Sequence, residues 1–200
     1  GLKVHEITSC KSYSEYQEMA ESECFISYSH KAEFFRALSI ALYNVKRGAV
    51  SFSYAEKARF STCGAMFDVS RNAVLKVESV KDLIERMALM GLNMLMLYTE
   101  DNYEVENQPY FGYMRGRYTI SEMQELDAYC LSIGIELIPC IQVLAHLGHI
   151  PRWEEYWSHM DSQDVLLVGD ERNYRLIENM LATLRKCFTE VTLLLCLCEI

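Results

Sequence analysis

Several features that would assign a class of protein are missing from this chain of 200 residues. Its 28 acidic residues outnumber its 19 basic ones, and the net charge of -9 disfavours nucleic acid and anionic membranes as partners. No secretory signal opens the chain, and no apolar run approaches the about 20 residues of a membrane span. These absences favour a cytoplasmic location.

The spacing of metal-binding residues is also missing, although the chain has eight cysteines. Several of them lie in apolar stretches, where a free thiol behaves as a small hydrophobic side chain, so we expect buried free thiols more than disulfides. Cys196-Leu-Cys198 lacks the spacing and the flanking ligands of a zinc knuckle. We therefore expect neither a metal nor another cofactor.

What the chain does have is a recurring pattern of short apolar runs that lead into polar residues. Each run has the length of a fully buried strand, and amphipathic helical stretches lie between them. The pattern predicts a (β/α) barrel, which places its active site at the carboxyl ends of the strands. The runs and the polar residues that follow them are 63–67 with Asp68 and Arg71, 92–98 with Glu100 and Asp101, 135–140 with Gln142 and His146, and 191–197 with Cys198 and Glu199.

The predicted fold class is α/β, with two domains. Residues 1–60 are expected to form a small α/β domain, and residues 61–200 the first half of a (β/α)8 TIM barrel with about four strands. In the first domain we expect a short helix from Ser12, a strand at 24–28 and a helix at 31–47. The later helices are expected to begin at Ser79, Thr119 and Glu171, and glycines at 91 and 134 are expected to end the first two of these.

The segment 99–118 is long for a loop after a barrel strand and contains four tyrosines. Aromatic faces in such a loop could stack on sugar rings, or the loop could pack on its own tyrosines. Trp153 and Trp157 lie four residues apart on an expected helix, and that spacing favours packing over a binding platform.

The polar residues at the strand ends leave two interpretations open when taken alone. Arg71 could bind a ligand or form a salt bridge to Asp68, and the pair Glu100 and Asp101 could belong to a site or to a solvated acidic loop. His146 alone on an apolar stretch would more often be a core histidine. His146 and His149 without a third ligand are a weak metal signal.

Three segments, in order and with matching spacing, resemble glycoside hydrolase family 20, the β-N-acetylhexosaminidases. Phe67-Asp-Val-Ser-Arg71 is similar to the Asp-x-x-Arg segment that ends the family's first barrel strand. Gly91–Asp101 resembles the second strand, which closes on an acidic pair, and Pro139–His146 resembles the third, which ends on a histidine. The Tyr-rich loop and the segment 138–142 are closer to the family's intracellular bacterial exo-β-N-acetylglucosaminidases.

The resemblance covers about 61–188 and implies roles for the residues at the strand ends. Arg71 would bind the hydroxyls of the non-reducing sugar, since a planar guanidinium offers several donors. Asp101 with Glu100 would lie beside His146 and orient it. The substrate-binding residues implied in this way are Arg71, Asp101, His146, Glu100 and Asp68.

The fourth strand departs from the family, in which it ends in an Asp-Glu pair reached through a glycine. The resemblance implies substrate-assisted retention, in which the acetamido oxygen of the sugar attacks the anomeric carbon, the Asp orients that group and the Glu is the general acid. Here Glu199 stands at the position of the acid, Cys198 replaces the Asp and Cys196 replaces the glycine. A frameshifted or truncated gene product is expected.

The implied function is hydrolysis of terminal N-acetylglucosamine or N-acetylgalactosamine from a glycan that contains N-acetylhexosamine, with this chain an inactive fragment. The alternative is a non-catalytic sugar-binding or interaction half-barrel that another chain completes. Self-association through the open barrel edges is expected in either case. The apolar residues expected to face the open lumen are Phe67, Leu95, Leu97, Ile138 and Leu195.

Overall fold

The computed structural model describes residues 3–7, 23–189 and 192–196, and every statement about structure refers to these residues. The expected helix at Ser12, and Cys198 and Glu199, lie outside them. The elements in chain order are β1 (Lys3–Ile7), β2 (Glu23–Ser27), α1 (Lys31–Lys46), β3 (Gly64–Asp68), α2 (Val77–Met90), β4 (Met94–Thr99), α3 (Ile120–Ile133), β5 (Glu136–Gln142), the 3-10 helices η2 (Ile150–Arg152) and η3 (Glu154–His159), α4 (Glu171–Cys187) and β6 (Leu194–Cys196).

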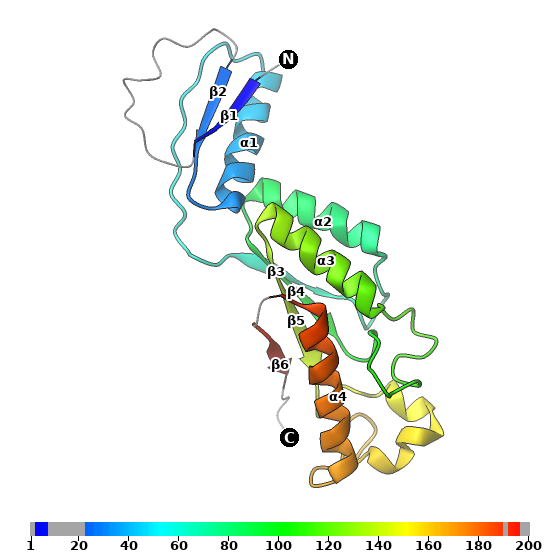
Figure 1. Ribbon diagram of the computed structural model, residues 1–200. Helices are drawn as coiled ribbons and strands as arrows, with labels where there is room; N and C mark the ends of the chain where they lie inside the picture. The colour runs from blue at the N-terminus through cyan, green and yellow to red at the C-terminus, as the bar shows by residue number, and fades with distance from the viewer. Residues whose placement is uncertain (1–2, 8–22, 190–191, 197–200) are drawn as a thin grey trace.

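Two parallel sheets organise the structure. β1 and β2 form a two-stranded sheet beside α1, and the larger sheet has the strand order β3-β4-β5-β6. Figure 1 shows α2, α3 and α4 on the larger sheet and the β1–β2–α1 unit at one end of the molecule. Strand-helix alternation with a parallel sheet confirms the α/β class and the partial barrel. We propose that the separate β1–β2–α1 unit is the small domain expected over 1–60.

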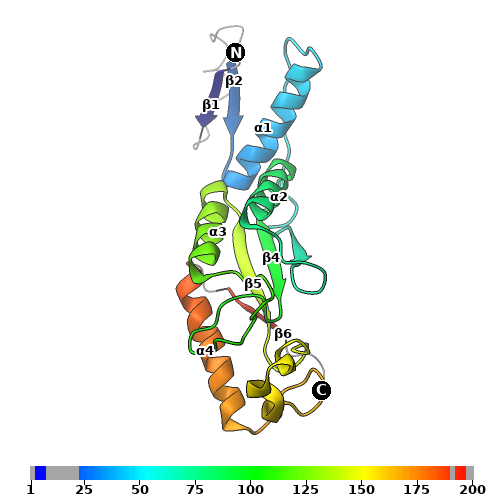
Figure 2. The ribbon, with the colours of Figure 1, turned by 90° about the vertical axis from the view of Figure 1, so that its right-hand side faces the viewer.

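In Figure 2 the strands β4 and β5 run away from the end that carries α1, toward the loops and the 3-10 helices. Because the strands are parallel, their carboxyl ends share this edge of the sheet.

Local sequence signals explain where the helices begin and end. Thr119 caps α3: its hydroxyl accepts from the amide of Glu122, whose carboxylate accepts from the amide of Thr119. Gly91 and Gly134 end α2 and α3 with φ of 81° and 85°, a left-handed conformation that glycine adopts without a steric penalty. α2 begins two residues earlier than expected, at Val77.

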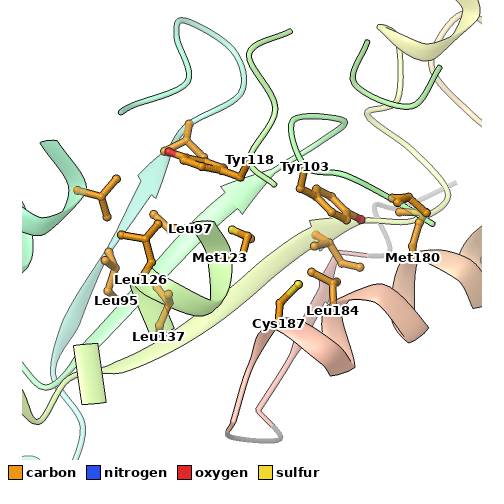
Figure 3. Close-up of a cluster of buried hydrophobic side chains, with 14 of the residues drawn as sticks. Leu95, Leu97, Tyr103, Tyr118, Met123, Leu126, Leu137, Met180, Leu184 and Cys187 are labelled. Carbon is orange, nitrogen blue, oxygen red and sulfur yellow. The ribbon is translucent and has the colours of Figure 1, made fainter. Parts of the chain in front are cut away.

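The main core fills the space between the larger sheet and its helices, as Figure 3 shows. Leu95, Leu97 and Leu137 from the strands are at most 2% exposed, and they pack with side chains of α3 and α4. Three cysteines, Cys130, Cys140 and Cys187, are buried, and Cys130 and Cys187 are free thiols.

The expected orientation of the strand side chains is wrong for four of the five residues assigned to the lumen. Strand pairing aligns Phe67 with Leu97 and Leu195 with Ile141, which places these residues, with Leu95, on the face covered by helices. The face opposite the helices carries Met66, Met96, Ile138 and Leu194. Both faces of a buried parallel strand are apolar, so the sequence pattern does not distinguish them, and an error of one residue reverses every side chain.

Two helices bury their apolar stripes to different extents. In α1, Leu42 is 50% and Val45 is 42% exposed, so only part of its apolar stripe is buried. In α4 the most buried apolar side chains are Leu176, Met180, Leu184 and Cys187, and the neighbouring Ile177 and Leu181 are partly buried.

The open face of the larger sheet generates a prediction about association. Met66 is 49% and Leu194 is 38% exposed, and among the described strands β3 and β6 each pair on one side only. We predict that this 200-residue chain self-associates at micromolar concentration, because burying about 400 Å² of apolar surface is worth roughly 10 kcal/mol. Sedimentation velocity measures this association.

Met66→Lys, which places a charge on the open face, should weaken the association. Met114→Lys is the matched control, since Met114 is 83% exposed and lies in a loop. A wild-type monomer that binds no hydrophobic dye would contradict the prediction.

Candidate functional site

The candidate site lies where the parallel strands end. Asp68, Thr99 and Gln142 are the last residues of β3, β4 and β5, and the polar residues singled out in the sequence follow them directly. Asp68 pairs in register with Tyr98 of β4, so the loop after β3 begins beside the end of β4.

Arg71 is the centre of the site. Its Nη1 lies 2.9 Å from Oδ2 of Asp68, its Nη2 donates to the Tyr98 hydroxyl at 2.7 Å, and its Nε is 3.5 Å from Oε1 of Glu100. The guanidinium carbon lies 4.5 Å from the centroid of the Tyr98 ring. The side chain is nevertheless 52% exposed, so a fixed cation presents free N–H groups to solvent.

The backbone around Arg71 keeps the Asp68 carboxylate ionised. Burial alone would raise the pKa of Asp68, but the amides of Arg71 and Ser70 donate to Oδ1 at 3.1 and 3.0 Å, and the guanidinium lies beside Oδ2. These interactions more than offset the burial and hold the pKa of Asp68 below its ordinary value.

Glu100 has the opposite character. Its side chain is 7% exposed, and burial raises its pKa above the ordinary value although Arg71, His149 and the Tyr98 hydroxyl each act to lower it. The Tyr98 hydroxyl donates to Oε1 at 3.3 Å, and Nε2 of His149 is 3.9 Å from Oε2. The site therefore holds one carboxyl group that ionises readily and one that retains its proton to higher pH.

A buried polar network joins the loop after β3 to the loop after β4. The Ser70 hydroxyl donates to Oδ1 of Asn102 and accepts from the Glu100 amide at 2.7 Å, and Nδ2 of Asn102 donates to the Val69 carbonyl at 3.2 Å. Ser70 and Asn102 are 1% and 0% exposed. The two loops are thus held as one unit.

Arg115 closes this network from the middle of the long loop. Its Nε lies 3.1 Å from Oδ1 of Asp101, whose side chain is 3% exposed, and its Nη2 donates to the Ser70 carbonyl at 2.6 Å. The carboxylate of Asp101 therefore forms a buried ion pair with Arg115 inside the protein.

The histidine contacts differ from those expected from the resemblance. Glu100 faces His149, while Asp101 faces Arg115. Nδ1 of His146 lies 3.9 Å from Oδ2 of Asp164, and the His146 side chain is 38% exposed. The backbone of His146 has a φ of 60°, which directs the chain away from the line of β5.

Reasoning from sequence missed the participation of Tyr98, Ser70, Asn102, Arg115 and His149. The spacing of His149 from His146 was visible, but it indicated only a weak metal pair. Among the residues that the structure describes, no group of three His, Cys, Asp or Glu side chains is placed to hold a metal ion. No helix in the described part is long and apolar enough to cross a membrane.

Gln142 adds an unsatisfied amide at the same edge of the sheet. Its side chain is 0% exposed, and within the described ranges neither its nitrogen nor its oxygen has a hydrogen-bond partner. Two shallow hollows of the described structure lie elsewhere, one lined by Glu104–Pro109 and the other by His30 and Glu136.

The site generates a prediction about two pKa values. Arg71→Ala should raise the pKa of both Asp68 and Glu100, because the guanidinium lowers both. In the wild type, carboxyl carbon NMR should show Asp68 titrating below 3.8 and Glu100 above 4.5. Arg36→Ala, on the surface of α1, is the control that should change neither pKa. Unchanged pKa values of both carboxyl groups in Arg71→Ala would contradict the assignment.

The sign of the pH dependence of stability follows from the same shifts. The lowered pKa of Asp68 stabilises the fold above the unfolded pKa of Asp68, and this contribution is lost as the pH falls through its folded pKa. The raised pKa of Glu100 acts in reverse: its contribution is present below the unfolded pKa of Glu100 and is lost as the pH rises through its folded pKa.

A second prediction concerns Arg115. Arg115→Met should lower the free energy of unfolding by about 3–5 kcal/mol, because it leaves the buried Asp101 carboxylate unpaired. Arg36→Met breaks the exposed pair with Glu56, and should cost no more than about 1 kcal/mol. Urea unfolding measures both, and equal effects of the two substitutions would show that Arg115 is an ordinary surface residue.

Comparison with known proteins agrees with the fold. No protein-family model matches the chain, and no curated protein matches it. Among solved structures, a family 20 exo-β-N-acetylglucosaminidase from Vibrio harveyi, in complex with N-acetylglucosamine, is similar with a TM-score of 0.77 and 18% identity over 99% of this chain and 38% of that one.

Two further structures show the same similarity. A β-N-acetylhexosaminidase matches with a TM-score of 0.73 and 16% identity over 94% of this chain and 48% of its own. The family 20 β-N-acetylhexosaminidase from Streptomyces coelicolor A3(2) matches with a TM-score of 0.69 and 19% identity, over 95% and 46%.

The chain spans less than half the length of these enzymes. The structural similarity confirms, at the level of the fold, the resemblance that the three strand-end segments indicated. The chain has the fold of the glycoside hydrolase family 20 β-N-acetylhexosaminidases over that part of their length.

Proposed function

We propose that this chain derives from a family 20 β-N-acetylhexosaminidase and that its Arg71 site binds the non-reducing N-acetylhexosamine of a glycan. The observation that carries the proposal is the half-exposed guanidinium of Arg71, held between two carboxyl groups at the carboxyl edge of a sheet with the family 20 fold. The three family-like segments end in or just before the residues of this site.

The chemistry of the site suits sugar hydroxyls. Each hydroxyl both donates and accepts, so neighbouring hydroxyls are best bound by a cation beside an ionised acceptor. Arg71 supplies the donors, and Asp68, 33% exposed and held ionised by its low pKa, supplies the acceptor. The hydroxyl of Tyr98 and the carboxyl group of Glu100 contact the guanidinium of Arg71 and hold it in place.

We propose further that the parent reaction is substrate-assisted retaining hydrolysis, and that this chain does not perform it. Cys198 stands where a carboxylate would orient and stabilise the acetamido group, and a thiol with a pKa of about 8.5 is mostly uncharged at neutral pH. The general acid position, Glu199, follows it directly.

The second candidate function is a non-catalytic sugar-binding or interaction module that another chain completes. The open sheet face around Met66 and Leu194 favours it, because a second half-barrel would cover that apolar surface. Co-purification of a stoichiometric partner that is lost in Met66→Lys would support this candidate over the first.

Binding of the monosaccharide tests the first proposal. Titration with N-acetylglucosamine, followed by amide NMR of the loops after β3 and β4, should show saturable shifts. Arg71→Lys should weaken binding about 10-fold or more, because an ammonium cannot reproduce the fork of charged donors. Arg36→Lys on α1 is the matched control and should bind as the wild type does. An affinity for N-acetylglucosamine that is the same in Arg71→Lys and in the wild type would contradict the proposed site.

Hydrolysis tests the second part of the proposal. A chromogenic N-acetylglucosaminide should release no chromophore above the rate without protein. Turnover that Glu199→Gln abolishes would show that the chain is a working enzyme.

A further inference from the structure

Two different loops, which follow β4 and β5, bring three aromatic rings together. Tyr110 and Tyr113 belong to the loop after β4, and Trp153 lies between η2 and η3 in the segment after β5. Trp153 stacks on Tyr110 with a centroid distance of 5.7 Å and an interplanar angle of 28°, and it meets Tyr113 edge to face at 5.1 Å. The Tyr110 and Tyr113 rings lie 6.1 Å apart at 85°.

Trp153 is partly buried and packs against the hydrophobic core, whereas the two tyrosines are more exposed. Tyr103 and Tyr118 of the same loop are 1% and 3% exposed, whereas Tyr110 and Tyr113 are 42% and 48% exposed. Among the described residues, neither the Tyr110 nor the Tyr113 hydroxyl has a hydrogen-bond partner. The loop thus divides its tyrosines into two that pack inward and two that are partly exposed.

The segment that carries the exposed rings is firmly held. Arg117 donates to the carbonyls of Pro109 and Phe111, and the Tyr156 hydroxyl, from η3, donates to the side chain of Gln108 at 2.9 Å. Met114, at the tip, has a φ of 59°, an uncommon conformation for a residue other than glycine. Such strain persists only where the surroundings fix it, and it clusters at binding sites.

The cluster is connected to the Arg71 site through one side chain. Arg115, two residues after Tyr113, reaches from this loop to Asp101 and to the carbonyl of Ser70, the residue before Arg71. Both features therefore lie at the carboxyl edge of the same sheet, and the buried network fixes one relative to the other.

We propose that Tyr110, Tyr113 and Trp153 form a stacking platform for a second pyranose ring of a carbohydrate ligand, next to the ring bound at Arg71. The identification of the first ring rests on the proposed function; the platform itself rests on the aromatic geometry. The C–H face of a pyranose packs on the electron-rich face of an aromatic ring, while ring hydroxyls bind the tyrosine hydroxyls.

Other occupants fit the surface less well. The net charge of -9 opposes nucleic acid, whose bases also stack on aromatic rings. Two half-exposed tyrosine rings and a partly buried tryptophan offer roughly 200 Å², which is below the about 800 Å² per partner of a standard protein interface. A single sugar ring matches that area.

Tryptophan fluorescence can test the platform, because the chain has two tryptophans. Trp157 is 63% exposed and makes no ring contact among the described aromatic pairs, so Trp157→Phe leaves Trp153 as the sole reporter. In that background the β-1,4-linked tetramer of N-acetylglucosamine should change the Trp153 emission saturably and bind more tightly than the monosaccharide.

Variants of Tyr113 then separate stacking from other effects. Tyr113→Ala should weaken tetramer binding roughly 2–10-fold while monosaccharide binding stays unchanged. Tyr113→Phe should retain most of the affinity, and Tyr43→Ala, at a 58% exposed tyrosine of α1, should change nothing. An unmoved Trp153 emission, or equal tetramer affinity in Tyr113→Ala, overturns the platform.

The two proposals fail in different ways. Arg71-dependent monosaccharide binding with a silent Trp153 would overturn the platform and leave the proposed function standing. A Tyr113-dependent response to the tetramer without any effect of Arg71→Lys would support the platform and overturn the assignment of the first ring. A Trp153 emission that depends on protein concentration, or that responds to oligothymidylate, would show that a second copy or nucleic acid occupies the surface, and would overturn the carbohydrate assignment.

Discussion

The site depends on one buried hydrogen-bond network, in which Ser70, Asn102 and Arg115 tie the loop after β3 to the loop after β4. Ser70 is the junction, since its hydroxyl holds Asn102 and the Glu100 amide while its carbonyl accepts from Arg115. Without this junction Arg71 and Glu100 would lie on two independent loops. With it, their 3.5 Å separation is a property of the fold.

The same network explains why so many polar groups are buried at an open edge. An unpaired carboxylate would be costly at the position of Asp101, but Arg115 pairs it, and Glu100 is surrounded by Arg71, Tyr98 and His149. As a result, the guanidinium of Arg71 is held by its protein contacts while half of the side chain remains exposed to solvent. A site that binds neutral, hydroxyl-rich ligands benefits from such fixed groups, because little side-chain entropy is lost on binding.

Much of the fold could be predicted because its signals are local. The apolar runs, the capping box at Thr119 and the glycines at 91 and 134 each depend on a few neighbouring residues, and the structure places a strand or a helix end at each. The strand faces could not be predicted, because β4 and β5 are apolar on both sides.

The site was predictable only in part, for a related reason. Asp68 ends β3, Arg71 lies three residues after it and Glu100 follows β4 directly, so the common edge of a parallel sheet brings them together. Arg115 reaches Asp101 from the middle of a long loop, and His149 replaces His146 opposite Glu100 after the turn at positive φ. These contacts depend on how the loops fold back, which no spacing along the chain encodes.

Native-state hydrogen exchange tests most directly whether the two loops form one unit. The amides of Ser70 and Arg71 donate to Asp68, and the amide of Glu100 donates to Ser70, so the three should open together. Their opening free energy should lie within about 1 kcal/mol of that of Leu97 in β4. Arg115→Met should lower the protection of all three amides by the same amount and leave a larger protection at Leu97. The account would be contradicted if the three amides exchange independently of one another, or if Arg115→Met does not change their protection.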